Sequence, residues 1–255
     1  MIVFEHPLTE RVRGFLRLEF LFKSIATRIT GPSEWDSRAA LARLSEVVEI
    51  LSRYDIKVEL IKELERHYAI LVRLQTNREV EPARLNEIIS QLNSLLTTLK
   101  DPLCQPGQTL RQDELVNAIR QRIGIPGGTC NFYMPAYHSW LNRPAEERIN
   151  QLHLWFEDLR IIEESVTLAL KVTRGSADPV QAVAPGGYYH QSLEPGCACS
   201  LIRIGLPKDW GLFPEISAGK PRFTLRFMEQ QNTNKRPIQT HRDVRFELSC
   251  CTLSA

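Results

Sequence analysis

The sequence lacks the long apolar run that a membrane-spanning helix needs. No stretch of its 255 residues approaches the roughly 18 consecutive apolar residues required. The N-terminus, MIVFEHPLTER, carries acidic residues and a proline where a signal peptide would have a basic start and a long apolar core. We therefore expect a cytoplasmic protein without membrane insertion. Its composition, 43% hydrophobic and 24% charged, is ordinary for a globular chain with a full core.

Cysteine is too sparse to indicate a disulfide scaffold in a chain of this length. The Cys-x-Cys at 197–199 and the Cys-Cys at 250–251 lack the CxxC spacing of zinc knuckles, and adjacent residues of a strand face opposite ways. We expect no metal site, and we interpret the thiols as small buried hydrophobes. The six cysteines are Cys104, Cys130, Cys197, Cys199, Cys250 and Cys251.

Catalytic motifs are also missing. His138, His153 and His190 lie far apart, and none belongs to an i, i+4 ligand pair or to a nucleophile motif. The glycine pair at 127–128 lacks the lysine and the glycine spacing of a phosphate-binding loop. We therefore expect no enzymatic activity and no cofactor.

The charge of the chain is nearly balanced but unevenly distributed. The formal net charge is +2, and residues 181–255 hold nine Lys or Arg against six Asp or Glu, while the first 180 residues hold 23 against 24. This mild excess suits an acidic peptide better than a nucleic-acid duplex, for which a strongly basic domain is expected.

The most informative stretch, residues 222–228, alternates strictly. Phe223, Leu225 and Phe227 fall on one face of a predicted strand, and Arg222 and Arg226 fall on the other. Four residues at about 3.3 Å each separate the two arginines by roughly 13 Å, which suits an extended acidic peptide or phosphates. The alternative is an ordinary half-exposed antiparallel strand without a binding role.

The N-terminal part predicts a bundle of helices. Apolar residues recur at helical spacing, punctuated by caps and prolines, and we assign residues 8–178 to a helical domain. The predicted helices cover residues 9–29, 33–53, 60–72, 82–99 and 113–123, and one long helix runs from Pro144 to about Gly175.

The C-terminal part, residues 179–255, predicts a small antiparallel sheet, so the fold class is α+β. Prolines and glycines punctuate short β-prone runs at 188–193, 200–206, 212–216, 222–228 and 244–251. Two β-prone segments, 1–7 and 127–134, are isolated among helices. Since a lone strand cannot satisfy its backbone polar groups, we expect both to join this sheet.

Short strings along nearly the whole chain, in order, resemble the ZapD family of bacterial cell-division proteins. No single string is diagnostic, but their order and spacing make the resemblance specific. They are FEHPL (4–8), LRLEFL (16–21), IRQRI (119–123), IPGG (125–128), HSWL (138–141), FPEIS (213–217), RFTLRFM (222–228) and FELSCC (246–251).

The resemblance implies a cytoplasmic, non-enzymatic homodimer recruited to the division ring at midcell, where it binds the C-terminal tail of FtsZ and bundles FtsZ filaments. In that family basic residues hold the tail. Glu114 departs from the pattern because a basic residue is expected there, and Arg111, one helical turn earlier, is the compensating candidate. The candidate tail-binding residues are Arg17, Arg53, Arg111, Lys220, Arg222 and Arg226.

Two alternatives remain open. A single-stranded nucleic-acid binder would use the basic C-terminal sheet, but Phe223 and Phe227 lie opposite the arginines, so stacking and phosphate contacts would not share a surface. We therefore expect no nucleic-acid partner. A passive scaffold, whose apolar helical stripes bind another helix, is the third possibility.

Overall fold

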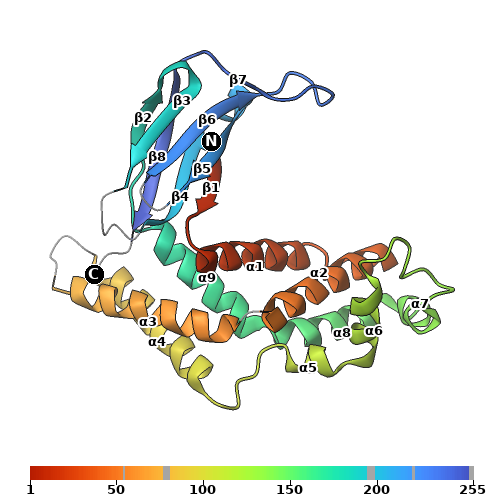
Figure 1. Cartoon of the computed structure of the whole chain (residues 1–255). Helices are drawn as coiled ribbons and strands as arrows, with labels where there is room; N and C mark the ends of the chain where they lie inside the picture. Colours follow the sequence, from red (N-terminus) through yellow and green to blue (C-terminus); the bar gives the residue numbers. More distant parts are fainter. Residues whose placement is uncertain (54, 77–80, 194–198, 220–221, 253–255) are drawn as a thin grey trace. The chain divides into compact units, whose positions relative to one another are not determined.

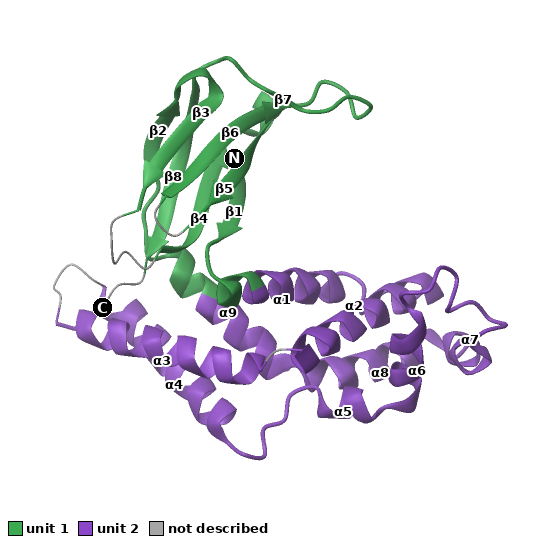
Figure 2. Cartoon of the chain, in the orientation of Figure 1, with its two compact units in different colours: residues 1–13, 170–255 green, residues 14–169 purple. Residues whose placement is uncertain are grey.

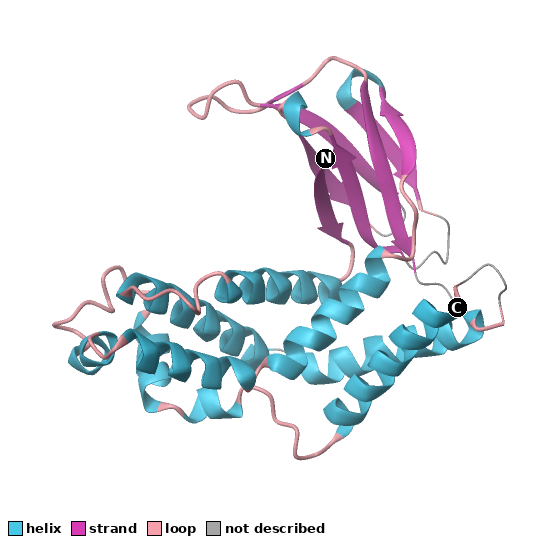
Figure 3. Cartoon of the chain, turned by 180° about the vertical axis from the view of Figure 1, so that it is seen from behind, coloured by secondary structure: helices cyan, strands magenta, loops and turns pink. Residues whose placement is uncertain are grey.

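The computed structural model describes residues 1–53, 55–76, 81–193, 199–219 and 222–252, and it divides into two compact units (Figures 1 and 2). One unit comprises residues 1–13 and 170–255, and the other comprises residues 14–169. Strands gather in the first and helices in the second (Figure 3). This confirms the predicted α+β class.

The helices begin where the sequence provides caps. Thr9 Oγ1 accepts a hydrogen bond from the amide of Val12 at 3.2 Å, and Asp113 Oδ1 accepts one from Val116 at 3.0 Å. Among the described residues, no helix is both long and apolar enough to cross a bilayer. The helices are α1 (Glu10–Ala26), α2 (Glu34–Arg53), α3 (Ile56–Leu74), α4 (Pro82–Lys100), α5 (Gln108–Gln112), α6 (Glu114–Arg122), α7 (Pro135–Leu141), α8 (Ala145–Glu157) and α9 (Arg160–Arg174).

The long helix predicted from Pro144 to Gly175 is wrong, because the structure breaks it between α8 and α9 at Asp158. The Asp158 carboxylate accepts a hydrogen bond from the Thr109 amide at 2.8 Å, and the Asp158 carbonyl accepts one from the Gly107 amide at 3.2 Å. The residue thus caps the short helix α5 from 49 positions away in the sequence.

The strand predicted at 127–134 is also wrong. This segment forms consecutive turns, with the amide of Cys130 donating to Gly127 O and that of Met134 donating to Cys130 O. Gly127 adopts a φ of +67°, which glycine tolerates and other residues rarely do. Phe132 and Tyr133 are 74% and 54% exposed, and despite their β-propensity neither residue belongs to a strand.

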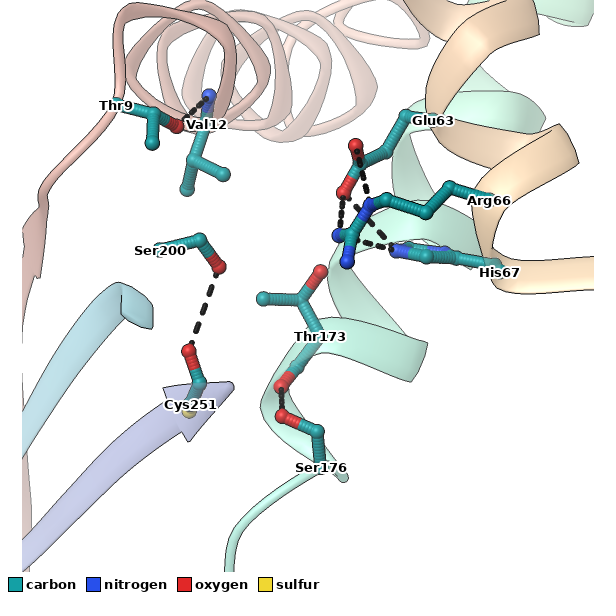
Figure 4. A network of polar contacts seen from close by, with 9 residues as sticks. All are labelled: Thr9, Val12, Glu63, Arg66, His67, Thr173, Ser176, Ser200 and Cys251. Carbon is teal, nitrogen blue, oxygen red and sulfur yellow. Dashed lines mark hydrogen bonds and ion pairs between the residues drawn. The ribbon is translucent and has the colours of Figure 1, made fainter. Parts of the chain in front are cut away.

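A compact polar cluster is buried on α3 (Figure 4). Glu63 Oε1 contacts His67 Nε2 at 3.0 Å and Arg66 Nη2 at 2.5 Å. Burial pushes the pKa of Glu63 up, but the hydrogen bonds from His67 and Arg66 outweigh it, and the pKa is lowered well below its usual range. The cluster keeps a buried carboxylate charged inside the helical unit.

The β unit is a sandwich of two antiparallel sheets. The first sheet has the order β1-β4-β8-β2, and the second has β3-β6-β5 with β7 also paired to β6. The strand β2 and the short strand β7 were not predicted. The strands are β1 (Ile2–Pro7), β2 (Val180–Ala184), β3 (Tyr188–Ser192), β4 (Cys199–Leu206), β5 (Leu212–Ala218), β6 (Arg222–Glu229), β7 (Ile238–Gln239) and β8 (Val244–Thr252), with 3-10 turns at Pro185–Gly187 and Lys208–Trp210.

The N-terminal strand β1 completes one edge of the first sheet. It pairs antiparallel with β4 from Ile2↔Leu206 to Pro7↔Leu201. Glu5 fixes this edge, because both its carboxylate oxygens accept hydrogen bonds from Arg174, at 2.8 and 2.7 Å, and Arg203 Nε donates a third at 3.0 Å. The isolated segment at the N-terminus therefore has the sheet partner that its backbone requires.

Candidate functional site

The strand β6 is anchored in the core of the β unit by alternate residues. Phe223, Leu225 and Phe227 are fully buried, and the Phe227 ring lies 5.0 Å from the ring of Phe246 in the opposite sheet. Burying a side chain of this size stabilises the fold by about 1.5–3 kcal/mol. The other face of the strand, with Arg222 and Arg226, is exposed as the alternation predicted.

The neighbouring strands add further side chains beside the arginines. The register pairs Tyr188 of β3 and Glu215 of β5 with Arg226, one on each side. Directly paired residues of a sheet project their side chains from the same face. We call this surface the arginine face; it consists of Arg222, Thr224 and Arg226 of β6, Tyr188, His190 and Ser192 of β3, and Glu215 and Ser217 of β5.

The arginine face is open and is held on rigid elements. Three strands spaced by about 4.8 Å make it roughly 10 Å wide, and the two arginines are roughly 13 Å apart along β6. Tyr188 is 44% exposed, and its ring stacks with that of His190 at 6.2 Å between centroids. The face can therefore offer charge, hydrogen bonds and an aromatic surface to an extended ligand.

The two arginines differ in their ionic surroundings. Arg226 Nη2 lies 3.3 Å from Glu215 Oε2, and both side chains are about half exposed. Arg222 is exposed and has no ion pair among the residues that the structure describes. Sequence reasoning missed Glu215, Tyr188 and His190, because their positions depend on strand register.

The helical unit contains a cavity of about 240 Å³. Two cations line it: Arg111 Nη2 donates to Pro106 O at 2.8 Å, and Lys57 Nζ donates to Cys104 O at 2.6 Å. Its apolar lining includes Leu51, Ile56 and Ile162. Asp55 lines the cavity as well, so its lining combines two cations, one acidic group and apolar side chains.

The remaining candidates are distributed over both units. Arg17 is exposed on α1, and Arg53, at the end of α2, pairs with Glu49. Lys220 lies outside the described residues. The expectation that Arg111 lies one helical turn before Glu114 is wrong, because α5 ends at Gln112 and Asp113 caps a separate helix. That Arg111 compensates for Glu114 stays a prediction.

Three of the thiols, those of Cys104, Cys199 and Cys251, are unsuited to nucleophilic chemistry. Burial raises the pKa of Cys104 and raises that of Cys251 to about 11, while a hydrogen bond to Cys250 and burial raise the pKa of Cys199. These thiols stay protonated at neutral pH. Within the described ranges, no three His, Cys, Asp or Glu residues are arranged to hold a metal ion.

Known proteins similar to this chain agree with one another. A family model described as "ZapD: Cell division protein" matches residues 16–226. The Cell division protein ZapD of Methylococcus capsulatus is 38% identical over 252 residues, which cover 99% of this chain and 98% of that protein. Those of Azoarcus sp. and Coxiella burnetii are 37% and 33% identical over 253 residues, covering 99% of this chain and 100% and 98% of the relatives.

Proposed function

We propose, since the chain belongs to the ZapD family of cell division proteins, that it binds the C-terminal tail of FtsZ and crosslinks FtsZ filaments. The observation that carries this proposal is the arginine face, where two exposed guanidiniums stand on a strand whose alternate residues are fully buried. Such a surface presents fixed charges to an extended acidic segment without rearranging the sheet.

The cavity of the helical unit supports the same function. Arg111 and Lys57 line it together with Asp55 and apolar side chains, so the cations exceed the acidic group by one and can contact an acidic side chain of a peptide. Arg17 and Arg53 are exposed cations of the same unit. These residues, with Lys220, remain candidate tail contacts that mutation can test one by one.

A crosslinker must hold two filaments at once, and we propose that the protein does so as a homodimer with one tail site in each subunit. It acts by binding rather than by catalysis and needs no cofactor. It is a cytoplasmic protein that is recruited to the division ring at midcell, where it promotes ring assembly and stability.

Co-sedimentation tests the proposal directly. The full chain is mixed with FtsZ filaments that carry their C-terminal tails and with filaments that lack them. We expect the protein to pellet, and the filaments to bundle, only when the tails are present. Equal pelleting with both filaments would refute tail binding and would favour a scaffold that docks elsewhere on the filament.

One observation favours a second candidate, a single-stranded nucleic-acid binder. The rings of Tyr188 and His190 lie on the arginine face, so stacking and phosphate contacts can share a surface after all. Filter binding of single-stranded RNA at several salt concentrations separates the two functions. Submicromolar, salt-sensitive RNA affinity without FtsZ binding would support this second candidate.

A further inference from the structure

The arginine face carries its charge unevenly. At one end, Glu215 lies opposite Arg226 and its carboxylate is 3.3 Å from the guanidinium, so the pair is locally neutral. At the other end, Arg222 is flanked by Ser192 on β3 and by Gly219, whose amide donates to Arg222 O at 2.9 Å just beyond β5. Neither neighbour brings a negative charge to Arg222.

This difference in charge determines which groups of a ligand can bind at each end of the arginine face. A carboxylate that approaches Arg226 also meets Glu215 at a similar distance, so attraction and repulsion largely cancel. A carboxylate at Arg222 meets no such opposition from the described residues. A cation has the opposite preference, because Glu215 is the acidic group of this face.

The aromatic side chains of β3 strengthen the difference between the two ends of the arginine face. Tyr188 pairs directly with Arg226, is 44% exposed and stacks with His190. An apolar side chain placed there can cover the Tyr188 ring, which offers a large contact area at a low entropy cost. The middle row, with His190, Thr224 and Ser217, carries no carboxylate.

We propose that Glu215 determines the specificity of the arginine face, by confining acidic side chains of the ligand to the Arg222 end. The ligand class is an extended peptide of divided character, acidic at one end and apolar or basic at the other, and Glu215 fixes the direction in which it lies. This inference rests on the proposed function, because it assigns the orientation of a peptide on the same face.

The test measures binding of a fluorescent FtsZ tail peptide to the full chain by anisotropy. In Glu215→Gln the side chain keeps its size and loses its charge, which releases Arg226. We expect this variant to bind about two- to fivefold more tightly, with a steeper salt dependence. Peptides in which each acidic residue is replaced by alanine in turn should show that acidic residues at one end support binding to the unaltered protein, whereas Glu215→Gln also gains affinity from acidic residues at the other end.

Glu229→Gln is the matched control. Glu229 lies on β6, the strand that carries the two arginines, and its carboxylate is 3.6 Å from Arg242, so its substitution releases a cation outside the arginine face with the same change in net charge. Its affinity should match that of the unaltered protein. Equal tightening by both variants would mean that net charge alone acts, and the inference would be overturned.

A third variant separates this inference from the proposed function. If Arg222→Gln loses binding while Glu215→Gln leaves it unchanged or weaker, the face binds the tail but Glu215 does not orient it. If the unaltered protein does not bind the peptide at all, the proposed function fails together with this inference. Thermal melting of each variant verifies that the β unit stays folded.

Discussion

Reversing both charges of the arginine face, Arg222→Glu with Arg226→Glu, should spare the fold. Both side chains are exposed, and such substitutions usually change the free energy of unfolding by about 0.5 kcal/mol or less. Arg226→Glu also sets a carboxylate opposite Glu215, and like charges in a cross-strand pair cost about 0.2–1 kcal/mol more. For a chain of this size, 1 kcal/mol shifts the melting temperature by roughly 2–4 °C.

Binding should respond far more strongly than stability. Truncating one partner of a desolvated charge contact costs about 2–5 kcal/mol, and a reversed charge adds repulsion against an acidic tail. The Kd of each site should therefore increase by a factor between about 30 and a few thousand. Bundling should fall further, because a crosslinker also loses an avidity of order a hundredfold or more when its paired sites weaken.

Light scattering of FtsZ filaments, combined with sedimentation velocity of the protein, measures both effects. Arg245→Glu is the control, since Arg245 is an exposed arginine on β8 in the other sheet and undergoes the same reversal as each of the two arginines; it is compared with the single variants Arg222→Glu and Arg226→Glu as well as with the double variant. We expect the control to bundle filaments normally. If the double variant stays dimeric and bundles as well as the control, the arginine face is not the tail site.

Four further predictions concern stability and folding. Asp158→Ala should lower the free energy of unfolding by about 1–2 kcal/mol in chemical denaturation, because two backbone amides of α5 lose their acceptor. Glu5→Ala should lower the free energy of unfolding by about 1–3 kcal/mol and reduce hydrogen-exchange protection in β1, since Arg174 loses its bidentate partner. A fragment of residues 181–255, which lacks β1, should not fold alone. Because the pKa of Glu63 is lowered, its contribution to stability is present above about pH 4.5 and is lost as the pH falls. The stability of Glu63→Gln should therefore depend less on pH during acid denaturation. A profile that matches that of the unaltered protein would contradict this.

The sequence pattern predicts a strand correctly where buried and exposed residues alternate along it. The strand β6 was predictable because Phe223, Leu225 and Phe227 repeat with the period of a strand, and the arginines follow from the same period. The register that sets Tyr188 and Glu215 beside Arg226 was not predictable, because it depends on pairing with segments that are separate in the sequence.

The two wrong elements have nonlocal or backbone causes. The apolar spacing runs unbroken through Asp158, whose backbone dihedrals stay in the helical region, and the α5 amides that its carboxylate caps are remote in the sequence. Residues 130–134 are β-prone, yet backbone hydrogen bonds between near neighbours close them into turns. Residue preference is a weak guide where a single contact or a tight turn decides the conformation.

The pairing of β1 with β4 has a consequence for synthesis on the ribosome. The strand β1 ends at Pro7, but its partner is complete only at Leu206, after the whole helical unit has been made. At about 5–20 residues per second, roughly 10–40 s separate the two strands. During that interval the helices can fold while β1 waits with its backbone donors and acceptors unpaired. During this interval chaperones and proteases can reach the unpaired segment that forms β1.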